Sequence, residues 1–156
     1  ANSGCLAHCS AQTFHDNLVA HEAGVGRTRN MDGYLPYACW RLLKERANWP
    51  VVLKGTWVRP EDMHHYEGLA DVAKLATRMH DRPELVVRAY AAGRFAGNLL
   101  DLLEPGYAPA FAPCIVDNTR FPDDWFARST ANPRAAHDDP YYRDVLDRVL
   151  ADVSDT

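Results

Sequence analysis

The sequence predicts an α+β fold in which a small antiparallel sheet packs against helices. A short apolar run at 51–58, bounded by proline and glycine, is typical of a buried strand. Helical periodicity occurs on both sides of this run, and the β-branched stretch 85–90 adds a second strand signal. An all-α helical bundle is the alternative, because residues 85–104 also carry apolar side chains at helical spacing. The 156 residues are expected to form a single domain.

Three helices are expected in the first half of the chain, over about 10–23, 36–48 and 60–80. Gly24 follows the first of them, which is a common way for a helix to end. Pro60 begins the third, and the two acidic residues that follow it suit the positive end of a helix dipole.

The second half is expected to supply most of the sheet. Residues 85–90 and 98–104 are predicted as two antiparallel strands around a turn at 92–94, and 108–116 as a third strand. One long helix over 85–104 is the other interpretation of the same residues.

Two further helices follow these strands. A short helix is expected after Pro122, and Pro140 begins a final amphipathic helix. Without the short helix, which lies in the loop-like stretch 121–139, the predicted order is α-α-β-α-β-β-β-α, an α+β arrangement.

The composition excludes several classes of protein. A net charge of −4 and a pI near 5.9 argue against broad nucleic-acid binding. No apolar run approaches the ~20 residues of a membrane span, so no membrane partner is expected. Four scattered cysteines are too few for a disulfide scaffold, and a reducing cytoplasm is the expected location, with a secreted form that carries one or two disulfide bridges as the alternative. The expected partner is a small-molecule substrate, and a homo-oligomer remains open.

The first candidate site contains Lys54 with Arg88, Asp101, Asp117 and Asn118. A lysine at the end of a strand is well placed to contact a phosphate. Carboxylate and amide oxygens are ligands that Mg²⁺ accepts while it keeps several waters.

The phrases Pro-Val-Val-Leu-Lys at 50–54 and Leu-Val-Val-Arg-Ala-Tyr at 85–90, each next to a helix, resemble the nucleotide-binding half of ATP-grasp carboxylate ligases over about residues 36–120. The resemblance implies that Lys54 contacts ATP phosphates, and Arg88 is assigned with it to catalysis and cofactor binding. It also implies that Asp101, Asp117 and Asn118 hold Mg²⁺. The implied function is ATP-dependent ligase or kinase-like chemistry on a small carboxylate, with ATP and Mg²⁺ as cofactors.

The second candidate site is N-terminal and consists of Cys5, His8, Cys9, His15 and Glu22. On one continuous helix these side chains would share a face, because residues four or seven apart lie above one another. Thiolate and imidazole are ligands for zinc and other borderline-soft metals. The alternative function is therefore a metal- or thiol-dependent helical protein.

A third hypothesis is a non-enzymatic protein-interaction domain. Aromatic residues lie near the ends of the predicted segments, where anchors of an interface are often found. They are Trp49, Trp57, Trp125, Tyr141 and Tyr142.

Overall fold

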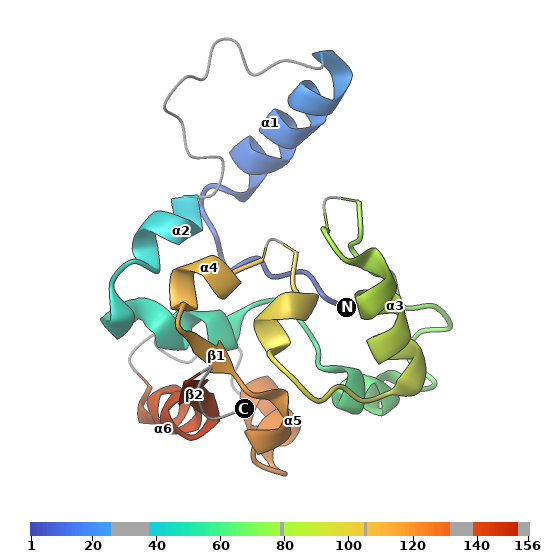
Figure 1. Ribbon diagram of the computed structural model, residues 1–156. Coiled ribbons are helices and arrows are strands. Elements are labelled where there is room, and N and C mark those ends of the chain that lie inside the picture. The colour runs from blue at the N-terminus through green and yellow to red at the C-terminus, as the bar shows by residue number, and fades with distance from the viewer. Residues whose placement is uncertain (26–37, 79, 105, 132–138, 153–156) are drawn as a thin grey trace.

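The computed structural model describes residues 1–25, 38–78, 80–104, 106–131 and 139–152 (Figure 1). Its elements, in chain order, are α1 (Gln12–Val25), α2 (Ala38–Leu42), the 3₁₀ helices η1 (Arg46–Lys54) and η2 (Pro60–Tyr66), α3 (Pro83–Ala92), the 3₁₀ helix η3 (Leu99–Leu102), α4 (Ala108–Phe111), β1 (Cys114–Val116), the 3₁₀ helix η4 (Asn118–Arg120), α5 (Trp125–Ala131), α6 (Pro140–Val149) and β2 (Leu150–Asp152).

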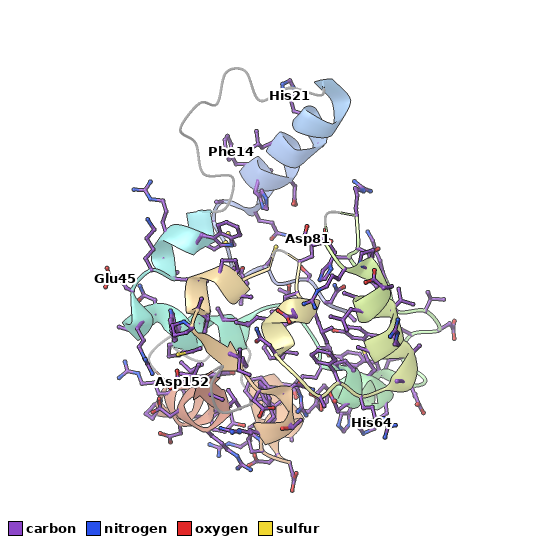
Figure 2. All side chains as sticks on the ribbon, in the orientation of Figure 1. Phe14, His21, Glu45, His64, Asp81 and Asp152 are labelled. Atoms are coloured by element: carbon purple, nitrogen blue, oxygen red, sulfur yellow. The ribbon has the colours of Figure 1, made fainter. Side chains whose placement is uncertain are left out.

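The predicted fold class is confirmed. Within the described residues, β1 and β2 form a two-stranded antiparallel sheet in which Ile115 lies opposite Ala151. Helices surround this small sheet, and α1 extends away from the other elements (Figure 1). Figure 2 shows Phe14 on α1 away from the core, and 53% of this side chain is exposed.

Aromatic side chains fill much of the core. The Trp49 ring stacks on Phe111 with 4.2 Å between ring centroids, and Trp57 stacks on Trp125 at 5.9 Å. Tyr142 is also buried, and its ring meets Trp125 edge to face. The prediction of exposed aromatic anchors is therefore wrong for Trp49, Trp57, Trp125 and Tyr142, which are each at most 7% exposed, while Tyr141 is half-buried.

The predicted strand at 51–58 is wrong, because residues 46–54 form the 3₁₀ helix η1. Two indole N–H groups hold this helix by bonding to backbone carbonyls. Trp49 Nε1 donates to the Leu43 carbonyl at 2.9 Å, and Trp57 Nε1 donates to the Val52 carbonyl at 2.8 Å. The run is apolar because residues 49–53 are buried, and α6 packs against η1.

The predicted hairpin within 85–104 is also wrong, and so is the single long helix. Residues 83–92 form α3, which has Pro83 in its first turn and ends at Gly93. Gly93 has φ 61°, a left-handed conformation that stops the helix, and its N–H bonds back to the carbonyls of Ala89 and Tyr90. Residues 99–102 then form η3. These local start and stop signals outweigh the β-branched residues between them.

The other helix predictions have mixed outcomes. The final helix is confirmed as α6, whose N-cap Asp139 accepts a hydrogen bond from the Tyr141 N–H. The short helix after Pro122 is confirmed as α5, and the first helix as α1 with bounds shifted by two residues. The helix predicted for 60–80 stops at Tyr66.

Two further predictions are confirmed in part. Of the third predicted strand, the last three residues form β1, while 108–111 form α4. The second predicted helix is represented by α2, and its expected start at Pro36 lies outside the described residues. Among the helices that the structure describes, none is long and apolar enough to cross a lipid bilayer.

Candidate functional site: a pocket lined by cysteines

A cavity of about 530 Å³ opens between the N-terminal segment, α2, η1 and α6. We call it the thiol pocket, because the cysteines of two separate segments reach it. Its lining includes Leu6, His8, Cys9, Cys39, Leu42, Asn48, Pro50, Val51 and Arg143. Apolar side chains make up most of the wall, and the thiols, the imidazole and one guanidinium supply the chemistry.

The phenol of Tyr107 lies behind these thiols. Its side chain is fully buried, and its hydroxyl donates to the Gly4 carbonyl at 2.7 Å. Cys39 lies within hydrogen-bonding reach of the same hydroxyl. Cys5 and Cys9 are near enough to act on it electrostatically. Thiols from two chain segments therefore lie on the same side of the molecule as this buried phenol, and Cys39 is the one that reaches its hydroxyl.

Burial affects the protonation of Tyr107 and Cys39. Desolvation raises the pKa of Tyr107 far above its ordinary value, and the neighbouring Cys39 raises it further. Desolvation also raises the pKa of Cys39, although the hydrogen bond with Tyr107 acts in the opposite direction. Cys39 is consequently a protonated thiol near neutral pH.

Backbone contacts fix the N-terminal segment against the rest of the molecule. Ser3 pairs with Glu104 and Leu6 pairs with Gly55 in isolated β-bridges. The Cys5 carbonyl accepts a hydrogen bond from the Thr56 N–H at 2.9 Å. His8 then has φ 58°, a left-handed conformation that is uncommon outside glycine, and it lines the pocket together with Cys9.

The second sequence-predicted site is brought together in part. Cys5, His8 and Cys9 precede α1, which begins at Gln12, so the expected single helix does not contain them. His15 lies on α1, and nothing is described of the Glu22 side chain. Among the residues that the structure describes, no group of three or more His, Cys, Asp or Glu is arranged to hold a metal ion.

Sequence reasoning missed Cys39 and Tyr107 as members of this site. Both are distant from Cys5 along the chain: Cys39 is brought near it by α2, and Tyr107 by the segment between η3 and α4. The fourth cysteine, Cys114, lies on β1, where its thiol donates to Asp152 Oδ1 at 3.6 Å. Figure 2 shows Asp152 at the opposite end of the molecule from α1. All four cysteines are free thiols.

The residues of the first candidate site line different cavities. Lys54 lines an aromatic cavity of about 240 Å³, where its Nζ lies 5.4 Å from the ring centroid of Tyr142. Arg88 lines a separate groove beside α3. Asp101 lines a third cavity and forms an ion pair with Arg82 at 2.8 Å.

Asp117 and Asn118 are adjacent, but they serve different contacts. Asp117 pairs with Arg120 at 3.0 Å and caps η4 by accepting from the Thr119 N–H. Asn118 is buried, and its Nδ2 donates to the Glu61 carboxylate at 3.0 Å. The structure therefore does not bring Lys54, Arg88 and Asp101 to one shared cavity.

Comparison with known proteins finds similarity to a protein that is named a protease. The chain is similar to a protein of the archaeon Methanocaldococcus jannaschii that is named an uncharacterized protease, with 31% identity over 105 residues. The match covers 66% of this chain and 31% of the relative, so the chain spans about a third of that protein's length. No family model matches the chain, and no solved structure matches it.

This relative corrects the first function prediction. An ATP-binding ligase or kinase is wrong for this chain, because the similar protein is named a protease. The comparisons do not bear on the resemblance to ATP-grasp enzymes itself, or on ATP and Mg²⁺ as ligands, and these stay untested predictions.

Proposed function

We propose that the chain is a section of a longer protease-like protein and that its thiol pocket is a thiolate centre for a thiophilic metal, zinc or iron. One observation carries the proposal: Cys9 and Cys39, which come from two separate segments of the chain, line the same pocket. Sulfur ligands favour zinc and iron–sulfur chemistry over magnesium or calcium.

The protonation of Cys39 supports a ligand role over a nucleophile role. A reactive cysteine needs a lowered pKa, whereas burial raises the pKa of Cys39. A metal ion displaces the proton from a thiol as it binds, so a ligand cysteine can be protonated in the free protein. The half-buried Cys39 therefore suits the role of a metal ligand.

The described residues supply only part of the ligands that a metal site needs. They contain no group of three or more donors already arranged around one metal position. The proposal therefore requires movement of the thiols on binding and further ligands from other parts of the chain or of the longer protein. A thiolate centre also requires reduced cysteines, which favours a reducing compartment such as the cytoplasm.

The test is anaerobic reconstitution of the 156-residue chain with Zn²⁺, or with Fe²⁺ and sulfide. We expect stoichiometric metal by elemental analysis and a higher melting temperature, because the metal binds the native state. The Cys9→Ser and Cys39→Ser variants should lose the metal, while the Cys114→Ser variant keeps it, since that thiol lies on β1. Equal metal content in all variants, or none in the wild type, would refute the proposal.

Peptide hydrolysis with Cys9 as the nucleophile is a second candidate. The name of the relative favours it, and His8 lines the same pocket as Cys9, where an imidazole can serve as a base. Metal-free protein would then hydrolyse peptides, and alkylation of Cys9 would stop the reaction. If peptidase activity instead survives in the Cys9→Ser variant, this candidate is excluded.

A further inference from the structure

A second cavity, on a different part of the molecule, contains two arginines. It has a volume of about 510 Å³ and lies along the C-terminal half of α3 and the segment that follows it. We call it the arginine groove, and its lining includes Glu61, Leu85, Arg88, Arg94, Phe95 and Ala96. None of these residues lines the thiol pocket.

The two arginines differ from others that the structure describes. Arginines at four positions pair with an aspartate, at distances of 2.8 to 3.8 Å; they are Arg59, Arg82, Arg120 and Arg128. Arg88 and Arg94 form no ion pair or hydrogen bond with any described residue. Their guanidinium groups therefore remain available to a ligand.

The one carboxylate in the groove is already engaged. Glu61 Oε1 accepts hydrogen bonds from the Phe95 N–H at 2.6 Å and from Asn118 Nδ2 at 3.0 Å, and Oε2 accepts from the same amide at 3.0 Å. These donors hold Glu61 as part of the fold. Two guanidinium groups against one carboxylate leave the groove with a net positive charge.

The remaining wall is apolar. Leu85 and Phe95 are half-buried, and Ala89, Ala92 and Ala96 line the groove beside them. An apolar wall with a few polar groups at defined positions is typical of a small-molecule site. Guanidinium groups bind the planar oxygen pairs of carboxylates and phosphates with two parallel hydrogen bonds.

We infer that the arginine groove binds a small organic anion, with its carboxylate or phosphate between Arg88 and Arg94 and its apolar body on Leu85 and Phe95. This inference is independent of the thiol centre, because it uses neither the cysteines nor a metal. The ligand is defined by two features together, an oxyanion and an adjacent apolar group.

The test is a titration of the metal-free chain with four probes, followed by chemical shifts of the arginine side chains and of Phe95. Phenyl phosphate and benzoate carry both features, inorganic phosphate lacks the apolar body, and benzyl alcohol lacks the charge. We expect at least one of the two aromatic anions to bind at least about tenfold more tightly than either partial probe. The preferred aromatic anion then identifies the phosphate or the carboxylate as the recognised group.

Arginine variants locate the site. Arg88→Gln and Arg94→Gln should each weaken binding of the preferred anion by about tenfold or more. Arg148→Gln removes an exposed arginine from α6 and should change the dissociation constant by less than about twofold. Circular dichroism of each variant confirms that it is folded. Unchanged affinity in both groove variants, equally tight benzyl alcohol, or no binding of either aromatic anion up to about 20 mM would overturn the inference.

Discussion

Gly55 follows η1 at a point where the backbone passes close to the indole of Trp57. A Cβ atom added there would lie 2.6 Å from Trp57 Cδ1 and 2.7 Å from Nε1. The indole cannot easily move away, because it is 7% exposed and its N–H bonds to the Val52 carbonyl. Glycine is therefore required at this position for steric reasons.

The Gly55→Ala variant should lose about 1–3 kcal/mol of unfolding free energy, as overpacked sites do. Urea denaturation followed by tryptophan fluorescence measures this loss. Gly106→Ala is the matched control, because its added Cβ would lie 3.7 Å from the nearest atom, the Leu103 carbonyl oxygen. A Gly55→Ala variant as stable as Gly106→Ala would contradict the steric account.

Tyr107 is expected to affect both the unfolding free energy and the pKa of Cys39. The Tyr107→Phe variant leaves the Gly4 carbonyl without its donor, which should cost about 1–2 kcal/mol. It should also raise the pKa of Cys39 further, because the Tyr107 hydrogen bond lowers that pKa. The rate of Cys39 alkylation should then increase at a higher pH than in the wild type.

Tyr90→Phe provides the control for this prediction. It also removes a partly buried hydroxyl, which donates to the Val58 carbonyl at 2.6 Å, but Cys39 is not among its neighbours. Mass spectrometry of the alkylated protein across pH separates the two effects. The same alkylation profile in both tyrosine variants would show that Tyr107 does not influence Cys39.

At the scale of elements, Asn118 connects three segments. It begins η4, and its Nδ2 donates to Glu61 of η2 and, at 2.7 Å, to the Phe95 carbonyl beyond α3. Because the amide is buried, its loss leaves a carboxylate and a carbonyl short of a donor. Such groups are costly when water cannot replace the lost partner.

Asn118→Ala should therefore destabilise the protein by about 2–3 kcal/mol in urea denaturation. Asn48→Ala serves as the comparison, since Asn48 Nδ2 donates at a solvent-exposed site to one carbonyl, that of Leu42. Its loss should cost less than about 1 kcal/mol. If the two variants are equally stable, the Asn118 network does not hold these segments together.

Elements with local start signals were predictable from the sequence. The helix α6 carries its own capping aspartate, a proline in its first turn and one apolar face, so no distant residue is needed to specify it. The helix α3 carries comparable signals in Pro83 and Gly93, but its β-branched interior favoured a strand prediction. The 3₁₀ helix η1 was not predictable, because its backbone depends on indole bonds from Trp49 and Trp57.

The candidate site was predictable only where its residues are neighbours in the sequence. Cys5, His8 and Cys9 are neighbours in the sequence, so their association needed no knowledge of the fold. Cys39 enters the pocket because α2 packs over the N-terminal segment. Tyr107 reaches the same place from beyond η3. Contacts between such distant residues leave no periodic signal in a single sequence.

At the scale of the whole molecule, the buried Tyr107 and the half-buried Tyr90 and Cys39 make stability sensitive to high pH. Desolvation raises the pKa of Tyr90 and Tyr107 above the ordinary value of 10.0, and that of Cys39 above 9.0. The folded state thus keeps protons that the unfolded state releases. Stability is fully present below the ordinary values and is lost as pH rises toward the raised folded-state values.

The unfolding free energy should therefore fall between about pH 9 and about pH 11, by at most about 1.4 kcal/mol per pH unit for each group. Guanidinium denaturation at several pH values measures the slope. The Tyr90→Phe/Tyr107→Phe double variant should be less stable at neutral pH but show a shallower decline. An equal slope in the double variant would assign the pH dependence to other groups.

The pairing of β1 with β2 has a consequence for how the protein is made. The ribosome releases residues 114–116 well before it has added residues 150–152, so the first strand waits without its partner. During that interval α6 is also incomplete, and the apolar side chains of η1 that it covers remain in contact with water. Chains interrupted before residue 150 should therefore be the species that chaperones retain and proteases remove.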